Sequence, residues 1–164
     1  MNYADIKYCD VANGEGVRVS LFVSGCTHHC KECFNKEAWD FHYGNPFTQK
    51  EIDRILEYLK PNYIAGLSLL GGEPMEPVNQ EGILPLLRAV KQTYPEKNIW
   101  CYTGYLFDKD VLDKMCKESE VTKEIVSYLD IVVDGEFMID RKNLKINFRG
   151  SDNPVSYTHL TLPT

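Results

Sequence analysis

Short apolar segments alternate with amphipathic segments along this chain, and this alternation limits the possible fold more than any other feature. The apolar segments contain many β-branched residues and are bounded by turn-forming residues, which is typical of strands. The segments between them carry apolar residues at helical spacing. Strands that alternate with helices predict an α/β fold with a parallel sheet. The predicted strands are residues 17–23, 67–70, 98–102 and 130–135, with a further extended stretch near 145–148.

Capping residues and prolines define the predicted helices. Thr48 and Glu51 form a capping-box pattern at the start of the first helix. Pro85 is expected in the first turn of the second helix, because proline is tolerated there and not further along. Asp108 is the expected N-cap of the third helix. The predicted helices are residues 48–60, 83–94, 108–117 and 123–129.

Each predicted strand is followed directly by a turn that carries cysteine, glycine or acidic residues. Because the carboxyl ends of parallel strands meet at one edge of a sheet, these turns are expected to form one site. A complete eightfold barrel usually needs about 250 residues, whereas this chain has 164. We therefore expect an incomplete, open-sided parallel (β/α) barrel. The turns are residues 26–33, 71–74, 103–104 and 134–135.

Three cysteines lie close together on the turn that follows the first predicted strand. Cys26, Cys30 and Cys33 have the spacing C-x3-C-x2-C. Three thiolates can hold three irons of a cubane cluster, for which four ligands are usual, and leave the fourth iron open to chemistry. The alternative is a zinc site completed by His28 or His29. Zinc is less favoured because structural zinc ligands usually come as two separated pairs, and the sequence has no second pair.

Charge and composition argue against two classes of partner. The formal net charge is −6, so a nucleic-acid surface is not expected. The sequence has no signal-peptide pattern and no apolar run long enough to span a bilayer, so we expect no membrane association and a cytoplasmic location. Thiols stay reduced there, and six cysteines then indicate metal binding or catalysis. Three of them lack partners at metal spacing and are expected to be ordinary buried or partly buried thiols: Cys9, Cys101 and Cys116.

Two further turns are candidate parts of the site. The run Gly71-Gly72-Glu73-Pro74 would by itself indicate only a tight turn, but beside the cysteine loop it favours close backbone approach to a small ligand. Asp134 ends the fourth predicted strand and is a further site candidate. The segment 13–16 is better read as a turn before a strand than as a phosphate loop, because no helix follows it.

Together these residues resemble the radical S-adenosylmethionine superfamily. The cysteine motif after the first strand and Gly-Gly-Glu-Pro after the second carry the resemblance. Within the superfamily, three segments are similar to the small activases of glycyl-radical enzymes, and specifically to those that act on anaerobic ribonucleoside-triphosphate reductases. These segments are Trp-Cys-Tyr-Thr-Gly-Tyr at 100–105, Val-Asp-Gly-Glu-Phe at 133–137 and Phe-Arg-Gly-Ser at 148–151.

The resemblance implies two cofactors and a set of contacts. Cys26, Cys30 and Cys33 would ligate one [4Fe–4S] cluster, and S-adenosyl-L-methionine would chelate the open iron. The residues implied to contact S-adenosylmethionine are Glu32, Cys33 and Phe34 near the adenine, and Gly71, Gly72 and Glu73 at the methionine end.

The resemblance also implies a reaction and its partners. One electron would cleave S-adenosylmethionine to methionine and a 5′-deoxyadenosyl radical, which would take a hydrogen atom from a glycine of the reductase. No catalytic side chain is expected beyond the cluster and the cofactor, because the cofactor breaks the bond while the protein positions and shields it. The implied partners are the anaerobic reductase and a flavodoxin-type electron donor. Two alternatives stay open: activation of another glycyl-radical enzyme, and a non-catalytic zinc-binding interaction module.

Two departures from the family pattern bear on the domain limits. Glu32 stands where many superfamily members have an aromatic residue, and the sequence from Pro154 onward does not follow the family. We therefore expect a radical S-adenosylmethionine domain over residues 1–153. Residues 154–164 form a tail of atypical sequence that need not belong to the native protein.

Overall fold

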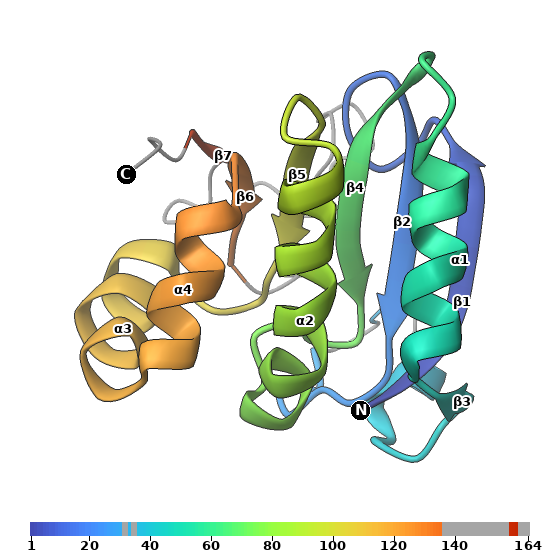
Figure 1. The fold of residues 1–164 in the computed structure, drawn as a ribbon. Coiled ribbons are helices and arrows are strands. Elements are labelled where there is room, and N and C mark those ends of the chain that lie inside the picture. The colour runs from blue at the N-terminus through green and yellow to red at the C-terminus, as the bar shows by residue number, and fades with distance from the viewer. Residues whose placement is uncertain (31–32, 34–35, 136–157, 161–164) are drawn as a thin grey trace.

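A seven-stranded sheet organises the molecule (Figure 1). The computed structural model describes residues 1–30, 33, 36–135 and 158–160. Within these residues the strand order is β3-β1-β2-β4-β5-β6-β7. The strands are β1 (Asn2–Asp10), β2 (Val17–Val23), β3 (Asn45–Pro46), β4 (Ile64–Gly71), β5 (Asn98–Tyr102), β6 (Ile131–Val133) and β7 (Thr158–Leu160).

The strands at the centre of the sheet are parallel, as predicted, whereas the strands that flank them pair antiparallel. β2, β4, β5 and β6 are paired in parallel. β1 pairs antiparallel with β2 and with β3, and β7 pairs antiparallel with β6. The α/β class is therefore confirmed, but the sheet is mixed rather than wholly parallel. In the described part of the chain the sheet is open, with β3 and β7 at its edges.

The helices fall between the parallel strands, as the right-handed α/β crossover requires. Figure 1 shows α1 and α2 side by side along one face of the sheet, with α3 and α4 beyond α2. No helix among the described residues is both long enough and apolar enough to cross a bilayer. The helices are η1 (Lys36–Trp39), α1 (Gln49–Leu59), α2 (Pro77–Thr93), the π-helical η2 (Phe107–Met115), α3 (Cys116–Glu118) and α4 (Glu120–Tyr128).

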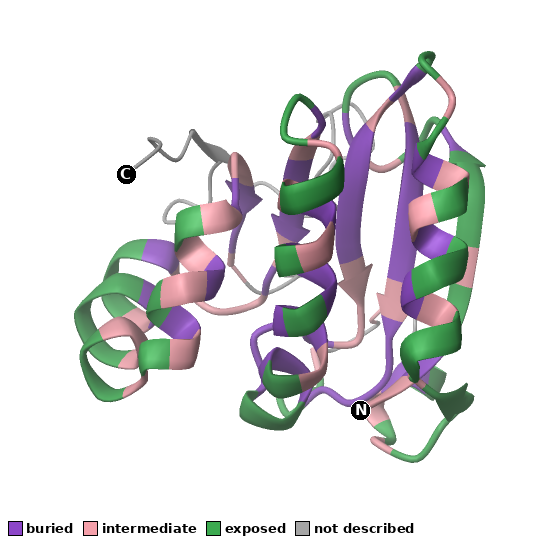
Figure 2. Ribbon diagram, viewed as in Figure 1, coloured by how far each residue is buried: buried purple, intermediate pink, exposed green. Residues whose placement is uncertain are grey.

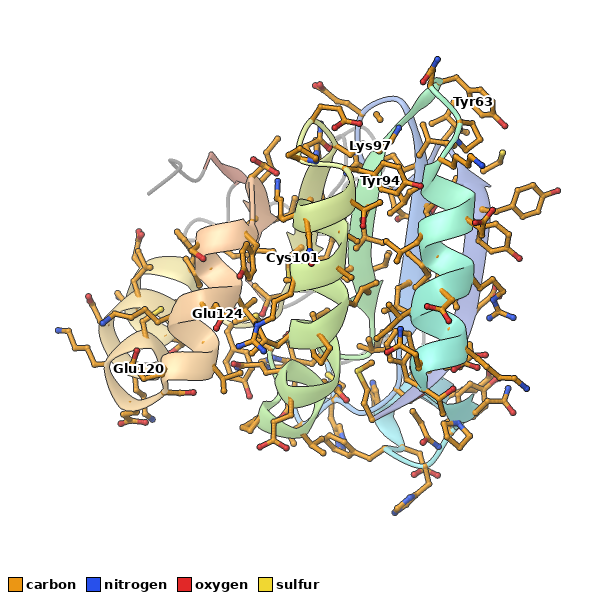
Figure 3. The ribbon with its side chains drawn as sticks, viewed as in Figure 1. Tyr63, Tyr94, Lys97, Cys101, Glu120 and Glu124 are labelled. Atoms are coloured by element: carbon orange, nitrogen blue, oxygen red, sulfur yellow. The ribbon has the colours of Figure 1, made fainter. Side chains whose placement is uncertain are left out.

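The main hydrophobic core lies between these helices and the sheet. Strand residues alternate between the two faces, and the register aligns Leu21, Leu69 and Cys101 on neighbouring strands. All three are buried in the core with the apolar residues of α1 and α2. Figure 2 shows the buried strands behind helices whose outer surfaces are exposed. Cys101 is labelled in Figure 3 between α2 and the sheet.

The opposite face of the central strands carries a row of polar and aromatic residues that is also buried. Ser20, Ser68 and Trp100 are aligned across this face, and each is buried. Arg18 on β2 is fully buried beside them and lies over the ring of Trp100, 5.3 Å from its centroid. An arginine is almost never fully buried without a charged partner. Its hydrogen bonds therefore determine whether this end of the sheet is stable.

The first predicted helix is confirmed, but the second begins earlier than predicted. Thr48 and Glu51 form the expected capping box of α1. α2 begins at Pro77, so Pro85 lies inside the helix and its placement in a first turn is wrong. Burial of the apolar face of α2, which includes Leu86 and Leu87, offsets the backbone hydrogen bond that proline cannot form.

The third and fourth predicted helices also need correction at their starts. The N-cap of η2 is Leu106, so Asp108 is not the cap. The backbone N–H of Leu106 donates instead to a carboxylate oxygen of Asp110 at 2.8 Å. α4 begins at Glu120, where the side chain of Ser119 caps it. Acidic and hydroxyl residues occur at several neighbouring positions, and their order in the sequence does not determine which one caps the helix.

The edges of the sheet were harder to predict. β1 was missed because it carries charged residues and shows no clear alternation of polar and apolar residues. Its outer side is covered by β3 only at Asn2 and Tyr3. The stretch predicted as extended near 145–148 lies outside the described residues. Within the tail of atypical sequence, β7 pairs with β6, with Val132 opposite His159.

Candidate metal centre

The turns after the four central strands meet at one edge of the sheet, as predicted. Three backbone hydrogen bonds connect them, each running from one turn to the end of a neighbouring strand or to a neighbouring turn. Cys26, Glu73, Thr103 and Asp134 are consequently parts of one connected region. The bonds run from Gly72 N to Val23 O at 2.7 Å, from Glu73 N to Gly25 O at 2.7 Å and from Thr103 N to Val133 O at 2.9 Å.

The three cysteines lie on the loop that leaves β2, and they differ in exposure. Cys26 is buried, whereas Cys30 and Cys33 are partly exposed. At the start of the motif Cys26 N donates to Trp39 O at 3.2 Å, and at its end Cys33 N closes a local turn by donating to Cys30 O at 3.1 Å. Burial raises the pKa of the Cys26 thiol to about 11, while hydrogen bonds from the backbone of His28 and His29 oppose this rise.

The donor set and its position fit an iron–sulfur cluster. Among the residues that the structure describes, no three cysteine, histidine or carboxylate side chains converge closely enough to hold one metal ion. In a cubane cluster, however, the cysteine thiolates bind different irons. Three thiols on one loop would supply ligands to such a cluster, and the backbone of His28 and His29 would supply hydrogen bonds to the Cys26 sulfur.

Glu73 lies at the centre of the site and is 1% exposed. Its Oε1 atom accepts hydrogen bonds from His28 Nε2 at 2.8 Å and from Gly104 N at 2.6 Å. Its Oε2 atom accepts from Met75 N at 2.8 Å. The hydroxyl of Thr103 lies 2.9 Å from both oxygens. Donors from the protein therefore replace the water that this buried carboxylate has lost.

The two glycines of the same turn are required by the protein backbone. Gly71 has a φ of +110°, and a Cβ there would lie 2.6 Å from the backbone of Val23. A Cβ on Gly72 would lie 2.6 Å from Gly25 O and 2.8 Å from Ala38 O. Close packing of the β4 turn against the cysteine loop explains both residues. Their predicted contact with S-adenosylmethionine stays a prediction.

A second buried carboxylate holds the same loop from α2. Glu76 is 5% exposed, and its Oε1 accepts from the backbone and the hydroxyl of Thr27 at 3.1 and 2.6 Å. The same oxygen accepts from the hydroxyl of Tyr105 at 3.3 Å. Sequence reasoning included Thr103 only as part of the predicted turn 103–104 and overlooked Glu76, whose only signal was its position two residues after the predicted turn 71–74.

The remaining predicted residues are accounted for in different ways. Glu32 and Phe34 lie outside the described residues. Asp134 is buried and accepts a hydrogen bond from Phe107 N at 2.7 Å, at the start of η2. Of the three cysteines without metal spacing, Cys101 is buried and Cys116 is partly exposed, as expected, whereas Cys9 is exposed on β1.

The comparisons with known proteins agree with this site, and a family model gives the class of protein. Residues 12–156 match the model of the 4Fe-4S single cluster domain, so the chain is a member of that family of iron–sulfur proteins. More closely, it is similar over almost its whole length to proteins named anaerobic ribonucleoside-triphosphate reductase-activating protein, and it belongs to their family.

Three of these relatives show how far the similarity extends. The protein of Pasteurella multocida is 40% identical over 159 residues, which cover 96% of this chain and 97% of the relative. That of Haemophilus influenzae is 40% identical over 157 residues, with 94% and 96% covered. That of Enterobacteria phage T4 is 43% identical over 155 residues, with 93% and 91% covered.

Proposed function

We propose that this chain activates an anaerobic ribonucleoside-triphosphate reductase by generating a glycyl radical in it. The observation that carries the proposal is the loop of Cys26, Cys30 and Cys33, which lies at the carboxyl edge of the parallel strands. The relatives that are similar to this chain over almost its whole length are named for this activation. The proposal makes the chain an oxidoreductase of the radical S-adenosylmethionine type, with the sheet as an open-sided partial barrel.

The chain's own residues would hold and enclose the cofactors. Cys26, Cys30 and Cys33 would bind one [4Fe–4S] cluster, and burial of Cys26 would keep water from that side. When bound, the cluster and S-adenosylmethionine would supply the chemistry: reductive cleavage of the sulfonium and removal of a hydrogen atom from a glycine of the reductase. No acid or base of the chain is needed for that step.

The contacts with S-adenosylmethionine are proposed from the resemblance and constrained by the site. Glu73 already has protein donors on both oxygens, so a ligand ammonium at the methionine end would share or replace one of them. Gly71 and Gly72 would contact that end through their backbone groups, because protein atoms fill the space that a Cβ would take at either residue. Glu32, Cys33 and Phe34 would lie near the adenine. We place the reaction in the cytoplasm, with a flavodoxin-type protein as electron donor.

The experiment is radical formation in the partner. The chain is reconstituted with iron and sulfide without oxygen, mixed with the anaerobic reductase, S-adenosylmethionine and dithionite, and followed by electron paramagnetic resonance. We expect a glycyl-radical doublet that is lost in Cys30→Ser. Cys9→Ser is the matched control, because Cys9 is exposed near the end of β1 that lies opposite the start of β2, and it should behave like the unchanged chain. A cluster-loaded chain that forms no doublet in this reductase but does so in another glycyl-radical enzyme would redirect the proposal.

A further inference from the structure

We propose that His28 is a positioning residue for the iron–sulfur cluster, held by a buried network that extends from Glu73 to Thr103 and Gly104. The inference rests on the proposed function, because it concerns the shape of the loop that would hold the cluster. On this proposal, the turns after β4 and β5 fix the part of the motif between Cys26 and Cys30. His28 lies midway between these two cysteines in the sequence.

The ring of His28 is fixed on two sides. Its Nε2 lies 2.8 Å from Glu73 Oε1, and its side chain is 9% exposed. The carboxylate is an acceptor, so Nε2 carries the hydrogen in this contact. The ring also packs edge-on against Tyr105, with 4.4 Å between ring centroids and 67° between ring planes. A hydrogen bond and an aromatic contact together leave the ring one orientation.

The absence of a side chain at Gly104 is part of the same arrangement. A Cβ there would lie 2.6 Å from Cδ2 and 2.7 Å from Nε2 of His28. The backbone N–H of Gly104 donates to the same oxygen of Glu73 that His28 binds. The turn after β5 therefore touches the histidine directly and also shares its hydrogen-bond partner.

Thr103 links the end of β5 to Glu73 through its hydroxyl. Its hydroxyl donates to the carboxylate and accepts a hydrogen bond from Tyr105 N at 3.1 Å. It is 6% exposed, so water does not readily replace it. Loss of the hydroxyl would leave Glu73 held only by His28, Met75 N and Gly104 N, and therefore less tightly fixed. His28 would then be held less firmly by Glu73, and the cysteine loop could shift with it, although residue 103 is far from the cysteines in the sequence.

The orientation of the loop should affect the cluster through its ligands. Residues that orient metal ligands typically change metal affinity about 10- to 100-fold when they are mutated. His28 occupies such a position, because the backbone on either side of it leads directly to Cys26 and Cys30. The second carboxylate, Glu76, holds Thr27 independently. The loop should therefore remain folded when the contact between His28 and Glu73 is removed.

The test compares variants of the reconstituted full chain without relying on turnover. His28→Ala removes the ring, and His28→Gln keeps an N–H donor on the side chain. Thr103→Val removes the hydroxyl at nearly constant shape, and Thr103→Ser keeps it. His42→Ala is the control, because His42 is an exposed histidine outside the cysteine loop. The readouts are the rate of iron loss to a chelator, the electron paramagnetic resonance spectrum of the reduced cluster, and the melting temperature of the iron-free chain.

We expect His28→Ala and Thr103→Val to lose iron about tenfold faster and to show broadened or shifted cluster spectra. His28→Gln and Thr103→Ser should restore both properties. The iron-free chains of Thr103→Val and Thr103→Ser should differ too little in melting temperature to explain their difference in the rate of iron loss. If His28→Ala does not fold, the two Thr103 variants decide the question.

Two outcomes separate the failure of this inference from that of the proposed function. If the unchanged chain binds no iron, the proposed function fails. If the unchanged chain holds its cluster while His28→Ala and Thr103→Val match His42→Ala in iron loss and spectrum, the positioning role is overturned and the proposed function stands. Spectra that change only in proportion to melting temperature would also overturn it, since that result indicates a purely structural effect.

Discussion

The buried guanidinium of Arg18 gives the sharpest prediction about stability. It is fully buried, and no carboxylate among the described residues lies within ion-pair distance of it. Burial lowers the pKa of Arg18 to about 10, although the negative charges of Asp130 and Asp10 partly oppose that shift. The positive charge is therefore stabilised mainly by neutral hydrogen-bond acceptors, and these acceptors must lie where the guanidinium N–H groups point.

The hydrogen bonds of Arg18 use the whole fork of the guanidinium. They reach three neighbouring strands or turns, so a single ammonium nitrogen cannot replace them. Each acceptor left unsatisfied in a buried place costs about 1–3 kcal/mol. The bonds run from Nε to Ser68 Oγ at 2.7 Å, from Nη1 to Glu15 O at 3.1 Å, and from Nη2 to Leu67 O at 2.8 Å and Asn98 O at 3.3 Å.

We predict that Arg18→Lys lowers the free energy of unfolding by about 3 kcal/mol, because about two of these acceptors would lose their donors. For a domain of this size, that corresponds to a fall of roughly 6–12 °C in melting temperature. The measurement is thermal and urea unfolding of the iron-free chain. Arg88→Lys is the matched control, because Arg88 pairs with Glu124 at the exposed surface, where ion pairs contribute little. Equal melting temperatures for the two variants would refute the reasoning.

Three other perturbations have definite expected outcomes. Gly72→Ala should destabilise the chain by about 1–3 kcal/mol in urea unfolding, since its Cβ would meet two backbone oxygens, whereas in Gly82→Ala the neighbour is the movable side chain of Met1; equal midpoints would contradict this. Burial raises the pKa of Asp10, but hydrogen bonds and the charge of Lys7 outweigh it, so the pKa is lowered from 3.8. The stability that this shift contributes is present above pH 3.8 and should be lost as the pH falls through the lower pKa of the folded state. Asp10→Asn should therefore weaken the loss of stability in acid, as measured by urea unfolding. Burial raises the pKa of the Cys101 thiol well above 9.0, so it should resist alkylation at pH 9 until urea unfolds the chain, and rapid labelling of the folded chain would contradict its burial.

The sequence was most informative where several local signals coincide. The strand over residues 17–23 was predicted at its observed bounds, because a run of apolar residues ends at glycine on both sides. The capping box at Thr48 was confirmed because both of its partners are local. The meeting of four turns at one edge followed from parallel topology alone.

What the sequence did not reveal depends on long-range packing. β1 shows no alternation because β3 covers its outer side only at Asn2 and Tyr3, so most of its residues are exposed or partly exposed. Arg18 lies in a strand that reads as apolar, and only the acceptors of β4 and β5 explain its burial. Glu73 was predicted as a possible ligand contact, but its four protein donors come from three separate turns. No local pattern could bring those donors together.

One measurement tests the central claim most directly. The chain is reconstituted without oxygen, its iron is counted, and it is given dithionite and S-adenosylmethionine before 5′-deoxyadenosine is quantified. We predict about four irons per chain, a visible cluster spectrum and formation of the nucleoside, with cluster and nucleoside both lost in Cys26→Ser, Cys30→Ser or Cys33→Ser. A colourless protein that binds zinc and forms no nucleoside would contradict the account.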